Sequence, residues 1–145
     1  MPDPGAELRL QLAYPLEPAN APQFAADFVN EAAAQGMALD YSAASLAGLD
    51  AVIGSLRGTR VPVEQVADVL FGFGCYLGET LVRATGARWV SSTAVALGRP
   101  ALFPIIVQLP GGAGCDPVAQ PFVALTDGPA TSLAGFFEHH SHRTS

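Results

Sequence analysis

The chain contains no lysine, and its seven basic residues are all arginines, against 13 aspartates and glutamates. A net charge of −6 opposes binding to nucleic acid or to an anionic membrane, so we expect neither as a partner. Charged residues make up 14% of the chain and hydrophobic residues 50%, so polar side chains cover the surface thinly. We therefore expect a homodimer or larger homo-oligomer, and the acidic balance also permits a basic protein partner.

Cysteine is scarce as well: Cys75 lies in an apolar stretch and Cys115 follows a glycine-rich loop. No run of about 18 apolar residues is free of charges and helix breakers, so the sequence predicts no membrane span. The first residues lack the basic segment and apolar run of a signal peptide. We expect a cytoplasmic, bacterial protein with reduced thiols, folded as a single domain over residues 1–145 without disulfides.

Motifs that carry chemistry are missing too. The glycines of residues 111–114 follow a predicted strand, but no Lys-Ser/Thr pair completes a phosphate-binding loop. His139, His140 and His142 do not have the spacing of three zinc ligands on one helical face. We therefore expect no cofactor and no metal, and a protein that acts by binding rather than by catalysis.

Hydrophobic periodicity predicts an α+β fold: a single domain in which about four to five helices pack on a small antiparallel sheet. Residues 1–5 and 141–145 are polar and are expected to be disordered ends. The expected elements are a strand at 7–14, helices at 23–35, 39–56 and 63–85, a strand pair at 88–93 and 101–109, and helices at 116–125 and 130–140.

Helix ends are predicted from capping residues. Ser42 is the expected N-cap of the second helix, and Gly58 follows its last apolar residue. Gly86 is the expected end of the third and longest helix. Asp116 and Pro117 read as an N-cap followed by proline at the first helical position.

The long helix carries one narrow polar stripe, because Asp68, Glu79 and Arg83 project onto the same third of the helical wheel. Glu79 and Arg83 are four residues apart in the order that favours an ion pair. Two interpretations follow: a structural ion pair, or a carboxylate placed as a general base or ligand contact. In the second interpretation Asp68, Glu79, Arg83 and Trp89 are the candidate ligand-binding residues.

Gly74 and Gly78 interrupt the apolar side of this helix, where each costs about 1 kcal/mol relative to alanine. Close approach of another backbone or ring is the usual reason for such a cost. The spacing therefore predicts tight packing within the domain, with a helix–helix dimer seam as the alternative.

Three segments carry a resemblance to a known family: LDYSAASLAGLDAVI (39–53), GCYLGETLVRATGARW (74–89) and DGPATSLAGFF (127–137). Together they form a pattern of three successive helices. The first helix starts at Ser-Leu, the second carries a tyrosine, a glycine and Val-Arg and ends in GxxW, and the last starts again at Ser-Leu. The chain resembles a family of small uncharacterised bacterial proteins, mostly actinobacterial, of unknown function. The resemblance implies a shared α+β fold and imports no activity.

The sequence is compatible with two classes of function. The first is a protein-interaction module, with an immunity- or antitoxin-like inhibitor of a partner protein as one form of it. The second is a small ligand-binding domain or enzyme centred on Glu79, Arg83 and Trp89. The accessibility of Glu79 and Arg83 separates the two, because a ligand site needs a cleft that reaches this stripe.

Overall fold

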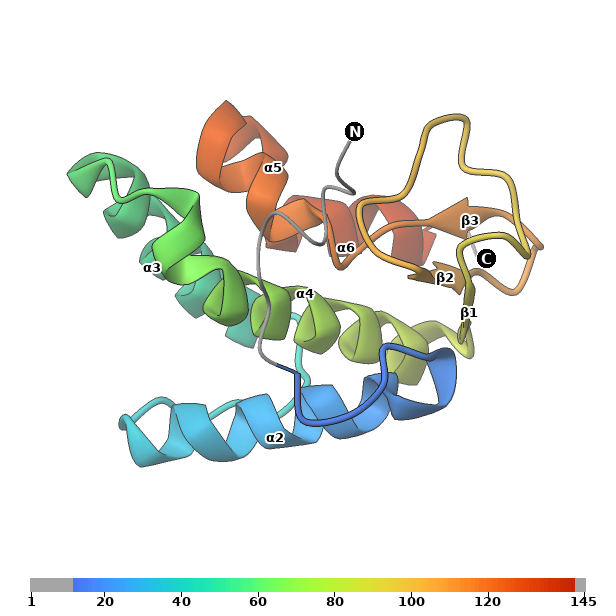
Figure 1. Cartoon of the computed structure of the whole chain (residues 1–145), viewed down its shortest axis with the longest axis horizontal. Helices are drawn as coiled ribbons and strands as arrows, with labels where there is room; N and C mark the ends of the chain where they lie inside the picture. Colours follow the sequence, from blue (N-terminus) through green and yellow to red (C-terminus); the bar gives the residue numbers. More distant parts are fainter. Residues whose placement is uncertain (1–11, 143–145) are drawn as a thin grey trace.

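A computed structural model of the chain describes residues 12–142, with the backbone alone for Pro129 and His142 (Figure 1). Five α-helices and a three-stranded antiparallel sheet form an α+β domain, which confirms the predicted fold class. The helices are α2 (Ala21–Ala34), α3 (Ser45–Thr59), α4 (Val63–Thr85), α5 (Gln120–Asp127) and α6 (Leu133–His142), with single 3₁₀ turns at η1 (Pro18–Asn20) and η2 (Pro129–Thr131).

The sheet has the order β1-β2-β3, from β1 (Arg88–Ser91), β2 (Ile105–Gln108) and β3 (Gly114–Cys115). Trp89 pairs with Val107 across β1 and β2, and Val107 pairs in turn with Cys115 of β3. The antiparallel pairing of the first two strands was predicted. The third strand was not predicted, because a strand of only two residues beside a glycine-rich turn is too short to show an alternating pattern.

Helix α4 is the centre of the fold and has the bounds that the sequence predicts, residues 63–85. Pro62 precedes it in an extended conformation, and Gly86 ends it in the left-handed region with φ of 80°. Every residue from 70 to 81 is buried. In Figure 1, α2 covers one side of α4, and α3, α5 and α6 lie on the other.

The glycines of α4 allow three close approaches. A Cβ on Gly74 would lie 2.5 Å from the carbonyl oxygen of Val118, and one on Gly78 would lie 2.5 Å from Cζ2 of Trp89. A Cβ on Gly72 would lie 2.6 Å from the ring of Phe28 in α2. The prediction of tight packing within the domain is confirmed for Gly74 and Gly78, since Val118 and Trp89 fill the space beside them.

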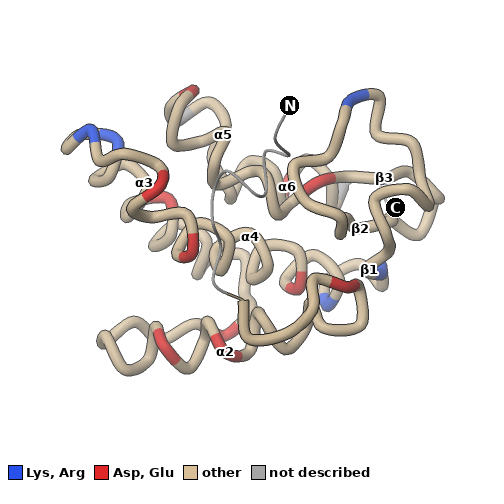
Figure 2. Tube along the Cα trace, viewed as in Figure 1, with Lys and Arg blue, Asp and Glu red and all other residues tan. Residues whose placement is uncertain are grey.

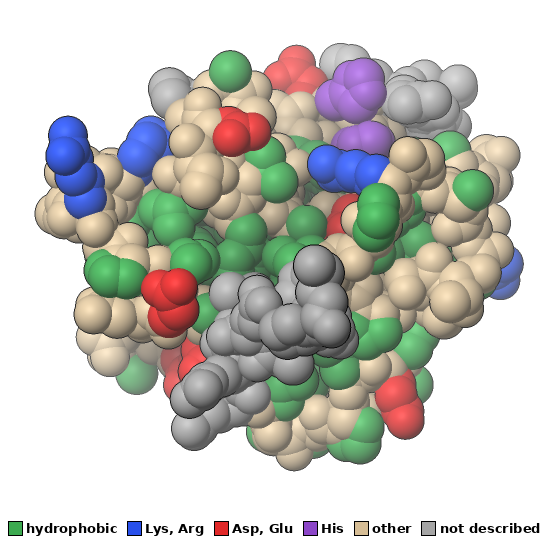
Figure 3. Space-filling model, turned by 45° about the horizontal axis from the view of Figure 1, so that its top comes forward, with side chains coloured by type: hydrophobic (Ala, Val, Ile, Leu, Met, Phe, Trp, Pro, Cys, Tyr) green, Lys and Arg blue, Asp and Glu red, His purple; other side chains and the backbone are tan. Residues whose placement is uncertain are grey.

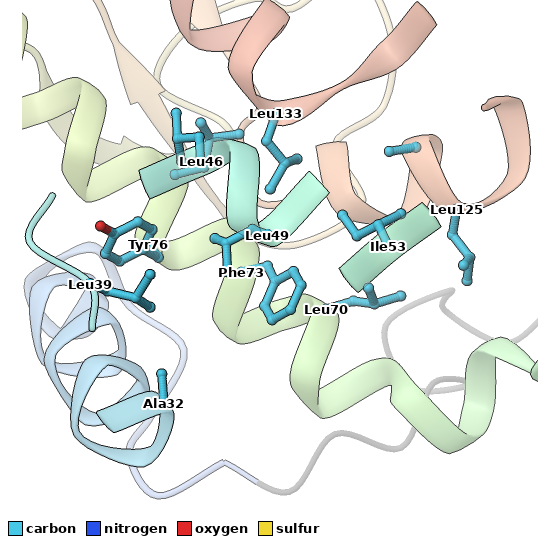
Figure 4. Packing of buried hydrophobic residues seen from close by; sticks show 12 residues of the cluster. Ala32, Leu39, Leu46, Leu49, Ile53, Leu70, Phe73, Tyr76, Leu125 and Leu133 are labelled. Atoms are coloured by element: carbon cyan, nitrogen blue, oxygen red, sulfur yellow. The ribbon is translucent and has the colours of Figure 1, made fainter. Parts of the chain in front are cut away.

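The largest buried cluster joins α3 to α4 (Figure 4). Leu46, Leu49 and Ile53 form the apolar face that the three-and-four spacing of α3 predicts, and they pack on Leu70 and Phe73 of α4. Burial of several such side chains, each worth about 2 kcal/mol, fixes α3 against the long helix.

Several predicted boundaries are wrong for local reasons. Residues 12–14 form no strand, and residues 1–11 lie outside the described part. Helix α3 begins at Ser45, later than the expected N-cap Ser42 implies, and Ser42 accepts a hydrogen bond from the Ser45 amide in the turn before the helix. The helix also continues past Gly58 and is followed by Arg60 in the left-handed region, with φ of 56°.

The C-terminal helices also start later than predicted. Asp116 accepts a hydrogen bond from the Ala119 amide, so it caps a turn that precedes α5 rather than α5 itself. Helix α6 begins at Leu133, and Ser132 accepts a hydrogen bond from the Gly135 amide. It ends at His142, beyond residue 141, where the disordered end was expected to begin.

Asp50 of α3 binds the start of α6 across the domain. Its two carboxylate oxygens accept hydrogen bonds from the backbone amides of Leu133, at 2.7 Å, and Ala134, at 3.1 Å. The carboxylate therefore satisfies two amides that the helix itself leaves without partners and lies at the positive end of its dipole.

We expect Asp50→Ala to lower the free energy of unfolding by about 1–2 kcal/mol, because both amides lose a charged acceptor. Urea denaturation followed by circular dichroism measures the change. Asp50→Asn keeps one acceptor and should lose less than Asp50→Ala. Equal stability of all three proteins would show that this contact contributes nothing.

Candidate functional site

Glu79 is the centre of the predicted polar stripe and is 7% exposed. Its Oε2 accepts a hydrogen bond from Nε of Arg83 at 3.1 Å, and its Oε1 accepts one from Nε1 of Trp89 at 3.1 Å. Each carboxylate oxygen thus has a donor from the same chain. A buried carboxylate needs such donors, because an unpaired buried charge is costly.

Arg83 lies above two stacked tyrosines. Its guanidinium carbon is 3.6 Å from the centre of the Tyr41 ring, and the Tyr41 and Tyr76 rings stack with centres 5.0 Å apart. The geometry is that of a cation–π contact on the side chain of Arg83, which is 55% exposed. Burial raises the pKa of Tyr41 above its usual value, while the charge of Arg83 lowers it.

Tyr41 adopts the left-handed conformation, with φ of 63°, which is uncommon for a residue with a Cβ. Its amide donates a hydrogen bond to the Tyr76 hydroxyl at 2.7 Å, and the same hydroxyl lies 2.6 Å from Oγ of Ser45. Tyr76 is fully buried and thereby holds the segment between α2 and α3 on α4. We name Tyr41, Tyr76, Glu79, Arg83 and Trp89 the Glu79 cluster.

Sequence reasoning placed three of these five residues in a candidate site. It missed the role of Tyr76, although this residue precedes Glu79 by one turn on the same stripe. It also missed Tyr41, for which the sequence gives no signal, since the contact is made from a loop 42 positions before Arg83.

Asp68 does not join the Glu79 cluster. It lies with Asp27 and Glu31 of α2 in the wall of a cleft of about 460 Å³ between α2 and α4. Of the four candidate ligand-binding residues, the structure therefore brings together Glu79, Arg83 and Trp89 and leaves Asp68 apart. No group of three or more His, Cys, Asp or Glu side chains suited to a metal ion occurs among the described residues.

A second cleft, of about 660 Å³, continues the first along the same seam. Phe28, Glu31 and Val69 line both clefts, so we treat them together as the α2–α4 groove. Val69 is 45% exposed and is the one large hydrophobic side chain that residues 12–142 leave exposed to this degree. Among residues 12–142, the groove walls carry Asp27, Glu31 and Asp68 and no arginine.

A third cleft, of about 370 Å³, lies between the segment 99–102 and α5. It contains Asp116 and Arg99, and we name it the Asp116 cleft. Burial raises the pKa of Asp116, while hydrogen bonds from the backbone of Ala119 and Leu102 and the charge of Arg99 lower it. The sequence predicted Asp116 as a helix N-cap and gave no indication that Arg99 lies in the same cleft.

Cys75 and Cys115 are both buried, and neither forms a disulfide. Burial raises the pKa of the Cys75 thiol, so it remains protonated and unreactive at neutral pH. Among the described residues, no helix is both long enough and apolar enough to cross a membrane.

The Glu79 cluster has the chemistry of a structural contact. The two carboxylate oxygens are occupied by Arg83 and Trp89, and the three clefts described above are lined by other residues. The exposed apolar surface lies instead in the α2–α4 groove, and the buried carboxylate that reaches a cleft is Asp116. No protein-family model, no curated protein and no solved structure matches this chain.

Proposed function

We propose that this protein is a non-catalytic interaction module whose α2–α4 groove binds a basic amphipathic helix of a partner protein. The observation that carries the proposal is the exposure of Val69 where the two clefts of the groove meet. A helix that lays an apolar face into a hydrophobic groove is a recurrent mode of peptide recognition.

The charge of the groove walls determines which kind of partner helix can bind. Asp27 and Glu31 lie in the groove wall, and Asp27 is hydrogen-bonded only by neutral groups, Tyr14 and Gln23, in the described part of the chain. Figure 2 shows that acidic residues are spread along α2 and α4, while most basic residues lie at the far end of α3 and near the sheet. Lysines or arginines beside the apolar face of a partner helix would match this surface.

A second copy of the chain suits the groove less well. Each protomer carries a net charge of −6, so self-docking would bring like charges together at this acidic seam. A basic partner reduces that repulsion and buries Val69 at the same time.

Fluorescence anisotropy of a labelled amphipathic leucine–lysine peptide, titrated with the full chain, tests the proposal. We expect saturable binding that weakens as NaCl rises from about 50 to 300 mM, because the charge contacts are screened. Val69→Ser should weaken binding about tenfold by removing buried apolar area. Ala84→Ser, an exposed α4 position outside the groove, is the matched control and should leave binding unchanged.

Equal binding by the Val69→Ser variant, or no saturable binding at low salt, would contradict the proposal. Light scattering after size exclusion tests whether a second copy of the chain, rather than a basic partner, occupies the groove. A dimer that Val69→Ser converts to a monomer, without peptide binding by either protein, would place a second copy in the groove instead.

A further inference from the structure

The Asp116 cleft is independent of the α2–α4 groove and lies on a different part of the domain. Phe122, Val123 and Thr126 line it from one face of α5, and Ala119 lines it from the position just before the helix. The segment 99–102 forms the other wall. Hydrophobic side chains gather beside α5 on the face that Figure 3 shows. The volume of about 370 Å³ suits a molecule of metabolite size.

Asp116 is the polar group inside this cleft. It is 4% exposed, and its Oδ1 accepts a hydrogen bond from the Ala119 amide at 3.3 Å. The other groups that stabilise its charge are the backbone of Leu102 and the guanidinium of Arg99. A carboxylate buried to this extent gains free energy from a cation placed directly against it.

Arg99 does not provide that direct contact. It is exposed, and within the described residues its guanidinium makes no hydrogen bond or ion pair, although its charge acts on Asp116. The cleft therefore presents a buried negative group and an exposed positive group beside apolar walls of Leu102, Phe122 and Val123.

We propose that the Asp116 cleft binds a small zwitterion with an apolar body, the chemistry of an apolar α-amino acid. The ammonium group pairs with Asp116, the carboxylate pairs with Arg99, and the side chain lies against Phe122 and Val123. A bidentate contact between guanidinium and carboxylate fixes the orientation of such a ligand, and the apolar wall favours aliphatic over charged side chains.

Titration of the isotope-labelled full chain with L-leucine, followed by amide resonances, tests the proposal. We expect saturable shifts of the Ala119 and Thr126 amide resonances at L-leucine concentrations up to about 10 mM, which corresponds to a Kd near 1 mM or below. L-Glutamate should bind more weakly by about tenfold, because its second carboxylate enters an apolar wall.

Two analogues assign the two charges. N-acetyl-L-leucine lacks the ammonium group and L-leucinamide lacks the carboxylate, so each should bind about tenfold more weakly than leucine. Arg99→Gln should weaken leucine about tenfold and leave leucinamide unchanged. Asp116→Asn should weaken leucine to the same extent and leave N-acetyl-leucine unchanged.

Folding does not confound these variants. Arg99 is exposed, and asparagine at position 116 retains the oxygen that accepts the Ala119 hydrogen bond. Thermal denaturation of each variant verifies this. Absence of saturable shifts with leucine would overturn the proposal. So would equal binding of leucine by wild type and Asp116→Asn, which would show that Asp116 is only the cap of its turn.

Discussion

Replacing Gly74 with alanine is expected to lower the free energy of unfolding by roughly 2–3 kcal/mol. The added Cβ would lie 2.5 Å from the carbonyl oxygen and 2.6 Å from Cα of Val118. Both are backbone atoms, so no rotamer change relieves the contact, and either α4 or the turn before α5 must move. This cost exceeds the gain of about 1 kcal/mol that alanine brings to a helix interior.

Gly54 provides the matched control, because it is also a helical glycine but has no atom within 4 Å of a built Cβ. Gly54→Ala should therefore raise the free energy of unfolding by about 0.5–1 kcal/mol through helix propensity alone. Urea denaturation of both variants measures the pair. Glycine-to-alanine substitution changes the free energy of unfolding in opposite directions at the two positions only if local packing determines the sign. A stabilising Gly74→Ala would show that Val118 does not approach α4 so closely.

The two glycines illustrate what the sequence can predict. Helix α4 was predicted with its observed ends because its boundaries are local: Gly86 ends it in the left-handed region, and Pro62 precedes it in an extended conformation. The need for close packing at Gly74 also followed from its local cost. Its partner, Val118, did not follow, because it lies 44 positions later and is brought there by the whole fold.

Asp68 shows a limit of the helical wheel. The wheel places Asp68 and Glu79 on one stripe, but as a projection down the helix axis it does not show how far apart they lie along that axis. Eleven residues separate them, which corresponds to about 16 Å at 1.5 Å per residue. The ion pair of Glu79 with Arg83 was predicted because four residues span about one turn, so its geometry is local.

The remaining contacts of the candidate sites depend on tertiary structure. Tyr41 reaches Arg83 from a loop whose left-handed backbone no local motif predicts. Arg99 and Asp116 share a cleft only because the segment 99–102 lies beside α5. Periodicity identifies the buried face of each helix, whereas the choice of neighbours comes from how the faces combine.

Glu79→Ala is expected to lower the free energy of unfolding by about 2–3 kcal/mol. Removal of the carboxylate leaves Nε1 of Trp89 without its acceptor in a half-buried site, and the ring loses the contact that holds it over Gly78. Arg83→Ala should cost less, about 0.5–1 kcal/mol, since that side chain is 55% exposed and solvent replaces its interactions.

The asymmetry between these two variants identifies what Glu79 does. If the carboxylate mainly anchors the indole of Trp89, Glu79→Gln should recover more than half of the loss, because a neutral amide oxygen still accepts that hydrogen bond. Urea denaturation monitored by tryptophan fluorescence measures both the stability and the environment of the single indole. A loss from Arg83→Ala as large as that from Glu79→Ala would contradict this assignment. The stack of Arg83 on Tyr41, rather than the link to Trp89, would then be the contact that stabilises this end of α4.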